Sequence, residues 1–315
     1  MRPEVIEGDV REVLKTLDDE SVQCVVTSPP YWGLRDYGVD DQLGLEPTPE
    51  EYVENMVSVF QEVKRVLRKD GTVWLNLGDT YSSHKDSKSP PQTVSKNNQH
   101  EMNKGKAVGR NAKILKEIGL KNKDLVGIPW RVALALQADG WYLRSDIIWN
   151  KPNPMPEAVK DRPTKSHEYI FLLTKSAKYY YDYEAIKEKG EYPAGTRAAK
   201  ASDKRFSMGF VNSRPPEYKI YDGTRNKRSV WKITTKPYKE AHFATFPKEL
   251  PEICIKAGTK KGDVVLDIFA GSGTTLRVAS KLGRKGIGIE LNPEYIKILN
   301  KRCKIESVSL ENWVE

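Results

Sequence analysis

Short runs of apolar and β-branched residues alternate along the chain with longer stretches in which apolar residues recur at helical spacing. The clearest helix spans 49–67, where Met56, Phe60, Val63 and Leu67 fall three or four positions apart. Strands and helices that alternate in this way are typical of an α/β fold, in which helices flank a mostly parallel sheet. Further helices are predicted at 274–282 and 293–302, and strands at 5–7, 22–28, 72–77, 143–149, 169–173, 264–268 and 286–290.

Composition narrows the class of protein. The chain has 315 residues, of which 38% are hydrophobic and 30% charged, so it can form one large domain or two. No apolar run approaches the roughly 18–20 residues of a membrane span, and the N-terminus lacks a secretory signal pattern. Cys24, Cys254 and Cys303 are scattered, which argues against a disulfide framework and a zinc site. We therefore expect a cytoplasmic protein without a bound metal.

Positive charge is concentrated in two segments. The net charge is +9, yet 81–125 contains 10 basic and 4 acidic residues, and 184–240 contains 14 basic and 7 acidic residues. A basic run can be only a solvated surface. Both segments, however, interleave their cations with aromatic or amide side chains, a mixture suited to phosphates and bases. Nucleic acid is therefore the favoured partner, and the polar stretch 82–108 is predicted to be a long mobile loop.

A glycine-rich turn lies between the predicted strand 264–268 and the helix after it. Gly271 and Gly273 allow backbone to approach a ligand, and the helix start offers free N–H groups. Glu290 ends the next strand, where a carboxylate can accept the hydroxyls of a ribose. The missing third glycine disfavours NAD, and the turn lacks the lysine of a phosphate-binding loop. The pattern indicates a nucleoside cofactor, although a glycine turn alone also fits a site without a ligand.

A second motif, Thr27-Ser28-Pro29-Pro30-Tyr31-Trp32, ends the strand 22–28. The prolines stop the strand and donate no hydrogen bonds, so their carbonyls are expected to remain available to accept from a ligand amine. Ser28 adds a hydroxyl and Tyr31 a flat ring at the same place. Taken alone, the motif also fits a turn that buries an aromatic ring.

Together the two motifs resemble those of the amino-group DNA methyltransferases that use S-adenosylmethionine. Ser28-Pro29-Pro30-Tyr31 precedes Phe269-Ala270-Gly271-Ser272-Gly273, the circularly permuted order typical of the beta class. Ile268 stands where many relatives have proline, which alters only the turn. The resemblance covers roughly 1–80, 125–180 and 240–303, with further matches at Gly8-Asp9-Val10, Gly288-Ile289-Glu290 and 242–247.

The resemblance implies a Rossmann-like sheet in which the strands ending at Ser28 and Asp267 lie side by side. It also implies a division of the chain into functional parts. These are a catalytic half at 1–80, a basic mobile insertion at 81–125, the remaining sheet strands at 126–183, a target recognition region at 184–240 and a cofactor half at 241–315.

Site residues are carried over by position. The catalytic residues implied are Ser28, Pro29, Pro30 and Tyr31. His167 and Glu168 are interpreted as scaffold or substrate-pocket groups rather than metal ligands. The residues implied to hold S-adenosylmethionine are Asp9, Phe246, Pro247, Asp267, Phe269, Gly271, Ser272, Gly273, Thr274 and Glu290, and candidate DNA contacts are Arg205, Arg214, Arg225 and Arg228.

The function implied is methylation of an exocyclic base amine in double-stranded DNA after the base has been flipped out. Ser28 favours cytosine N4 as the target, because adenine-specific relatives more often carry Asp at this position. Adenine N6 methylation by the same fold is the main alternative, followed by an RNA or small-amine methyltransferase and a non-catalytic DNA-binding protein. A cognate restriction endonuclease is a candidate partner.

Overall fold

A computed structural model of the chain describes residues 2–82, 116–199, 218–235, 246–305 and 307–314. The predicted loop 82–108, except for its first residue, lies outside the described residues, as do Arg205 and Arg214. The chain forms two compact units: Met1–Tyr181 with Ser229–Glu315, and Asp182–Arg228. None of the described helices is both long and apolar enough to cross a membrane.

The larger unit alternates strands with helices, as the hydrophobic pattern predicts. Every strand and helix expected from the sequence is present, with ends that differ by two residues at most, except that β3 begins five residues before the predicted 72. In chain order the elements are β1 (Glu4–Glu7), α1 (Val10–Val13), η1 (Leu14–Thr16), β2 (Val22–Thr27), α2 (Pro49–Val66), β3 (Leu67–Leu77), α4 (Ile128–Ala138), β4 (Tyr142–Asn150), β5 (His167–Thr174), β10 (Val230–Lys232), α5 (Glu249–Gly258), β11 (Val264–Asp267), α6 (Thr274–Lys281), β12 (Lys285–Glu290), α7 (Pro293–Cys303), β13 (Val308–Ser309) and α8 (Leu310–Val314).

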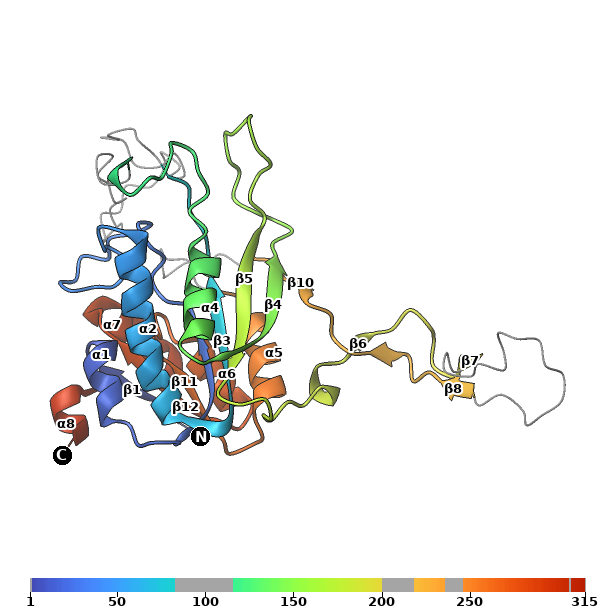
Figure 1. Cartoon of the computed structure of the whole chain (residues 1–315). Coiled ribbons are helices and arrows are strands. Elements are labelled where there is room, and N and C mark those ends of the chain that lie inside the picture. The colour runs from blue at the N-terminus through green and yellow to red at the C-terminus, as the bar shows by residue number, and fades with distance from the viewer. Residues whose placement is uncertain (1, 83–115, 200–217, 236–245, 306, 315) are drawn as a thin grey trace. The chain divides into compact units, whose positions relative to one another are not determined.

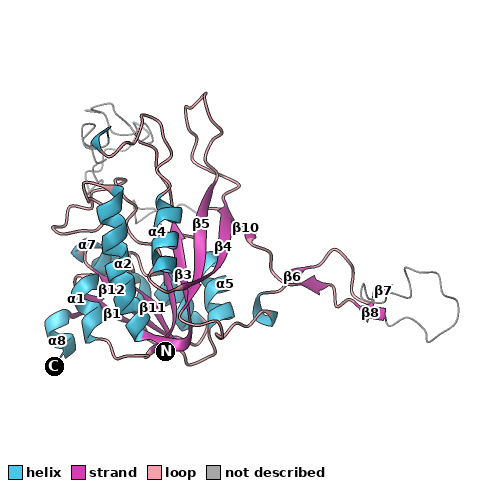
Figure 2. Ribbon diagram, in the orientation of Figure 1, coloured by secondary structure: helices cyan, strands magenta, loops and turns pink. Residues whose placement is uncertain are grey.

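Nine strands of the described chain form one sheet, in the order β10-β4-β5-β3-β2-β11-β12-β1-β13. Figure 2 shows strands of this sheet together with the helices that flank it. Only β5 runs antiparallel to its neighbours, β3 and β4, and every other pairing is parallel. Parallel neighbours need crossover connections, which the helices provide. The fold class predicted from the sequence, a mostly parallel sheet flanked by helices, is confirmed.

Helices cover both faces of this sheet (Figure 1), with α1, α2 and α4 on one face and α5, α6 and α7 on the other. Helix α2 shows why the sequence folds this way. Thr48 caps its N-terminus by accepting a hydrogen bond from the Glu51 amide at 3.2 Å, and Pro49 occupies the first turn. Its apolar stripe, which includes Met56 and Phe60, is fully buried in the core.

Four helices of the described chain are absent from the sequence prediction: the short α1 and α8 and the longer α4 and α5. Helix α4 is apolar on nearly every side, and Gly127, at its N-cap position, provides no side-chain cap, so neither the periodicity nor a cap residue marks it. Only its packing against α2 and β4 makes clear that it is a helix.

Strands β2 and β11 are parallel neighbours at the centre of the sheet, although they lie far apart in the sequence. Cys24 pairs with Val265, and Val25 pairs with Leu266. The carboxyl ends of parallel strands meet at one edge of the sheet, where α/β proteins bind ligands. The serine–proline motif and the glycine turn therefore leave the sheet side by side, as the resemblance implies.

The smaller unit, Asp182–Arg228, consists of short elements. It contains η2 (Glu184–Ile186) and two antiparallel pairs, in which β6 (Glu188–Lys189) pairs with β9 (Thr224–Arg225) and β7 (Arg197–Ala199) with β8 (Tyr218–Ile220). This unit overlaps the predicted target recognition region 184–240.

Candidate active site

A buried hydrogen bond joins the ends of β2 and β11. Thr27 Oγ1 donates to Asp267 Oδ1 at 2.8 Å, and the amide of Phe269 donates to the same oxygen at 3.2 Å. Burial raises the pKa of Asp267 to about 7, despite hydrogen bonds from Thr275, Thr27 and the Phe269 amide that favour the ionised form. Asp267 therefore ties the two motifs together.

The glycine turn has the backbone that its sequence predicts. Gly271 and Gly273 have φ values of +51° and +74°, in the left-handed region that favours glycine. A Cβ on Gly273 would lie 2.8 Å from Leu299 Cγ, so that glycine is required for packing. A Cβ on Gly271 would meet only the Phe269 carbonyl oxygen, 3.9 Å away. The turn is therefore closely packed on the Gly273 side and open at Gly271.

Glu290 lies at the end of β12 and faces the same turn. Its Oε2 accepts a hydrogen bond from the Gly271 amide at 2.7 Å, and its Oε1 accepts one from the Asn292 amide at 2.9 Å. Burial raises the pKa of Glu290 to about 6, and these backbone donors partly oppose the rise. The carboxylate thus has a fixed orientation beside the open part of the turn.

Ser272 and Thr274 lie on the side of the turn that faces α7. Arg302 donates to the Ser272 carbonyl at 2.7 Å, to the Ser272 hydroxyl, and to Thr274 Oγ1 at 3.5 Å. Both side chains are at least nine-tenths buried. Their hydroxyls fasten the turn to α7.

The remaining predicted cofactor residues lie at the ends of other elements. Asp9 caps α1 by accepting from the Arg11 amide at 2.8 Å, and its carboxylate also binds the Arg11 guanidinium. Burial by itself would raise the pKa of the Asp9 carboxyl. The hydrogen bonds and the positive charge of Arg11 outweigh this effect, so the pKa of Asp9 is lowered. Phe246 and Pro247 lie just before Lys248, the N-cap of α5, and the Pro247 carbonyl accepts a hydrogen bond from the Leu250 amide at 3.1 Å.

The serine–proline motif leaves β2 as an extended turn, with Ser28 half-buried and Pro29 buried. The two proline carbonyls differ in their surroundings. Tyr52 Oη donates to the Pro30 carbonyl at 2.9 Å, so the expectation that both carbonyls stay available is wrong for Pro30. The Pro30 carbonyl instead fixes the turn to α2.

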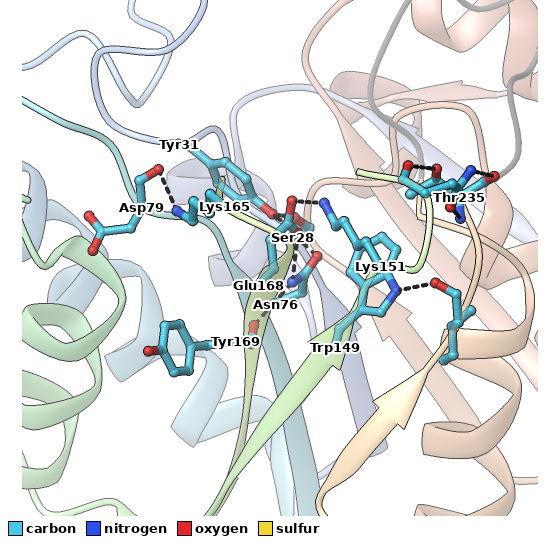
Figure 3. Close-up of polar contacts among 12 residues, drawn as sticks. Ser28, Tyr31, Asn76, Asp79, Trp149, Lys151, Lys165, Glu168, Tyr169 and Thr235 are labelled. Carbon is cyan, nitrogen blue, oxygen red and sulfur yellow. Dashed lines mark hydrogen bonds and ion pairs between the residues drawn. The ribbon is translucent and has the colours of Figure 1, made fainter. Parts of the chain in front are cut away.

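Tyr31 connects this turn to the neighbouring strands (Figure 3). Its hydroxyl lies 3.3 Å from Ser28 Oγ, 3.3 Å from Asn76 Oδ1 and 2.9 Å from Glu168 Oε2. Asn76 Nδ2 donates to the same carboxylate oxygen at 3.1 Å and to the Tyr169 carbonyl at 3.0 Å. Because Asn76 is the penultimate residue of β3 and Glu168 the second residue of β5, the antiparallel register of these strands brings both groups to Tyr31.

Two lysines complete this cluster. Lys151 Nζ forms an ion pair with Glu168 Oε1 and lies 4.3 Å from the centre of the Trp149 ring. Lys165 Nζ donates to the Asp79 carbonyl at 2.7 Å, and burial lowers the pKa of Lys165. The site therefore holds a hydroxyl, a phenol, an amide, a carboxylate and two ammonium groups.

Sequence reasoning missed Asn76, Lys151 and Lys165. None belongs to a motif, and each is one polar residue at the end of a strand or in the loop after it. Glu168 was interpreted as a scaffold or substrate-pocket group, and the structure places its carboxylate against Tyr31 and Asn76. A polar residue at the carboxyl end of a strand that adjoins β2 is the signal that could have found Asn76.

Arg225 and Arg228, in the smaller unit, are held by acidic neighbours. Arg225 donates to Glu188 at 2.9 Å and to Glu191 at 2.6 Å, and Arg228 donates to Glu188 at 3.1 Å. Their positive charges are thus partly balanced within the unit.

Comparisons with known proteins agree with this fold and identify a family. The N6/N4 methyltransferase family, described as DNA methylases, matches residues 22–301. The type II methyltransferase M.Cfr9I of Citrobacter freundii is 48% identical over 97% of this chain and 89% of its own length. M.SmaI of Serratia marcescens, also a type II methyltransferase, is 47% identical over 95% of this chain and 89% of its own length.

Solved structures share the fold at lower sequence identity. The cytosine-N4-specific PvuII DNA methyltransferase superposes with a TM-score of 0.63 and 20% identity, covering 98% of this chain and 95% of its own. A Thermus thermophilus protein in complex with S-adenosyl-L-methionine gives a TM-score of 0.60 and 24% identity, with 98% of both chains covered.

An α/β sheet whose glycine turn adjoins a serine–proline motif defines a methyltransferase fold with a permuted order of motifs. The chain belongs to the N6/N4 family of DNA methylases and is a DNA methyltransferase.

Proposed function

We propose that the protein transfers a methyl group from S-adenosylmethionine to the N4 amine of a cytosine in double-stranded DNA. The observation that supports this choice is Ser28 at the end of β2. Ser28 presents a neutral hydroxyl. The carboxylate of the site belongs to Glu168, and it is bound by Tyr31, Asn76 and Lys151.

The chain has a suitable place for the methyl donor beside the glycine turn. Space remains above Gly271, Gly273 precedes α6 without a side-chain cap, and the Glu290 carboxylate faces the turn. An uncapped helix start attracts a carboxylate such as that of the methionine portion, and Glu290 suits ribose hydroxyls. Phe246 and Asp9 are proposed for the rest of the cofactor. When bound, S-adenosylmethionine supplies an electrophilic methyl group.

The residues after β2 would align the acceptor. The exocyclic amine of cytosine is a poor nucleophile, because its lone pair is delocalised into the ring. Hydrogen bonds from the amine to Ser28 Oγ and to the Pro29 carbonyl would localise that lone pair and direct it toward the methyl group. Alignment of this kind supplies a large part of catalysis in group transfer.

A base inside a duplex cannot reach this site and must be flipped out, which costs a few kcal/mol. Tyr31 lies next to Ser28, where its ring can stack on the flipped base and return about 1–3 kcal/mol. The smaller unit, with Arg225 and Arg228, is proposed to help recognise the DNA sequence.

The test is to incubate the protein with S-adenosylmethionine and unmethylated mixed-sequence DNA, digest the DNA to nucleosides and identify the product by mass spectrometry. N4-methylcytosine is expected. N6-methyladenine would contradict the choice of base from Ser28 and leave the family assignment intact. Tyr31→Ala should lose most activity and keep its cofactor affinity, measured by calorimetry.

We also propose that a cognate restriction endonuclease cleaves the same site, since the relatives carry type II names. Once the methylated sequence is mapped, endonucleases specific for that sequence should cut unmodified DNA and leave DNA treated with this protein intact.

A further inference from the structure

Three oxygen atoms of the site form a continuous chain of hydrogen bonds that ends on a carboxylate. Ser28 Oγ donates to Tyr31 Oη at 3.3 Å, and Tyr31 Oη donates to Glu168 Oε2 at 2.9 Å. Asn76 Oδ1 also lies 3.3 Å from the phenol, but the shorter contact to a charged acceptor is the stronger one. The protons of both hydroxyls therefore point from Ser28 toward Glu168.

The far end of this chain is held in place. Lys151 pairs with Glu168 Oε1, the carboxylate oxygen that does not contact Tyr31. Asn76 Nδ2 donates to Oε2 and to the Tyr169 carbonyl, which fixes the amide. Lys165 is the other cation near Glu168, and it donates to the Asp79 carbonyl. Glu168 is thus oriented with one oxygen toward Tyr31.

Methylation of an amine makes one of its own protons acidic, and that proton must leave. The nitrogen forms a bond to the methyl carbon while the bond from that carbon to sulfur breaks, and the nitrogen becomes cationic and acidic. Its proton needs an acceptor within hydrogen-bond reach, and in the proposed alignment that acceptor is Ser28 Oγ. A serine hydroxyl that accepts this proton must pass its own proton on to end neutral.

We infer that Ser28, Tyr31 and Glu168 form a proton relay, with Glu168 as the final acceptor. As the new N–C bond forms, the amine proton moves to Ser28 Oγ, the Ser28 proton moves to Tyr31 Oη, and the Tyr31 proton moves to Glu168 Oε2. Both hydroxyls end neutral, the amine has lost one proton, and Glu168 has gained one. Solvent takes that proton after turnover.

Tyr31 suits an intermediate position in such a relay. Burial, together with the Glu168 charge, raises its pKa well above the ordinary value, so Tyr31 stays a neutral phenol that accepts one proton as it gives up another. The 3.3 Å contact to Ser28 is long for a hydrogen bond between oxygens, as catalytic contacts often are before substrate binds.

The relay rests on the proposed function, and single-turnover methyl transfer to the mapped DNA site tests it. The variants are Glu168→Gln, Tyr31→Phe and the double variant. Each single variant should lower the rate by ~100-fold or more, within the range of general acid–base catalysis. The double variant should be no slower than the slower single variant, because either change breaks the same relay.

Two further measurements separate proton transfer from simple positioning. Calorimetry with S-adenosylmethionine and the fluorescence of 2-aminopurine at the target position report cofactor binding and base flipping without turnover. Both should match the wild type in both single variants. Glu252→Gln is the matched control, since Glu252 is partly exposed on α5 and pairs with Lys256 at 2.7 Å, and the variant should keep full activity.

The outcomes are distinguishable. If the wild type methylates DNA and Glu168→Gln or Tyr31→Phe stays within about threefold of its rate, the relay is wrong. A slow variant that also fails to flip the base overturns the relay in favour of a positioning role. A wild type that methylates no DNA overturns the proposed function and the relay with it.

Discussion

Gly78 lies directly against the ring of Tyr31. A Cβ on Gly78 would come within 2.4 Å of Tyr31 Cε2 and 2.8 Å of Cδ2, closer than real side-chain contacts allow. Gly78 follows the end of β3, so the strand that supplies Asn76 also makes room for the phenol ring. The position of Tyr31 therefore depends on the absence of a side chain at residue 78.

Gly78→Ala should displace Tyr31 and slow methyl transfer while leaving cofactor affinity unchanged. Overpacking should cost about 1–3 kcal/mol of stability. The matched control is the same change in a Tyr31→Ala background, where the clash is gone and the added methyl group should cost little. Chemical denaturation of the wild type, the two single variants and the double variant measures the coupling energy between residues 31 and 78. An equal loss of stability from Gly78→Ala in both backgrounds would contradict the contact.

Asp267→Asn should remove a pH dependence of stability. The folded-state pKa of Asp267 is about 7, above its ordinary value of 3.8, so the folded protein binds the proton more tightly than the unfolded chain. The protonated Asp267 therefore adds to the free energy of unfolding. This contribution is complete below about pH 4 and is lost as the pH rises through 7, a change on the order of 4 kcal/mol. Asparagine mimics the protonated acid.

Thermal unfolding of both proteins from pH 4.5 to 8.5 measures this effect. The melting temperature of the wild type should fall relative to that of Asp267→Asn as the pH rises. A constant difference between the two would show that Asp267 does not titrate in this range.

Alanine at the two glycines of the turn should have different effects. Both residues have positive φ, so each change costs about 1–2 kcal/mol of backbone strain. Gly273→Ala should destabilise further, because its Cβ would meet Leu299. Gly271→Ala should instead lower the affinity for S-adenosylmethionine, because its Cβ enters the open space proposed for the cofactor. Denaturation and calorimetry of both variants provide the comparison, and equal cofactor affinities would argue against this placement.

The affinity for S-adenosylmethionine should rise with pH through about 6. Burial raises the pKa of Glu290 to about 6, and only the ionised carboxylate is a strong acceptor for ribose hydroxyls. Glu290→Gln should bind about tenfold or more weakly at pH 8, with no rise through pH 6. Glu294→Gln, an exposed change at the start of α7, is the control. A wild-type affinity that does not depend on pH would contradict the role of Glu290.

Arg225 should contribute to DNA binding by its charge. Arg225→Gln is expected to weaken binding and to reduce the slope of log affinity against log salt concentration by about 1. Glu188→Gln should have the opposite effect on affinity, because Glu188 now balances both Arg225 and Arg228. Fluorescence anisotropy at several salt concentrations measures both, and an unchanged slope for Arg225→Gln would assign it a structural role.

The sequence by itself determined the fold class, seven strands of the sheet, three of its helices and the two motifs. These signals are local: alternating apolar runs, two prolines after a strand, and glycines between a strand and a helix with an acidic residue one strand later. Each depends on residues close together in the chain, whose conformational preferences persist in any context. The resemblance based on these motifs led to the family, which the comparisons confirm.

The tertiary structure alone decided which groups surround the motifs. Glu168 lies 137 positions after Tyr31 and reaches it only because β5 is antiparallel to β3 in one particular register. A shift of one residue would turn Glu168 to the opposite face of the sheet. The pairing of Thr27 with Asp267 likewise depends on β2 lying beside β11. Such contacts arise from the packing of the whole sheet, so no local pattern in the sequence records them.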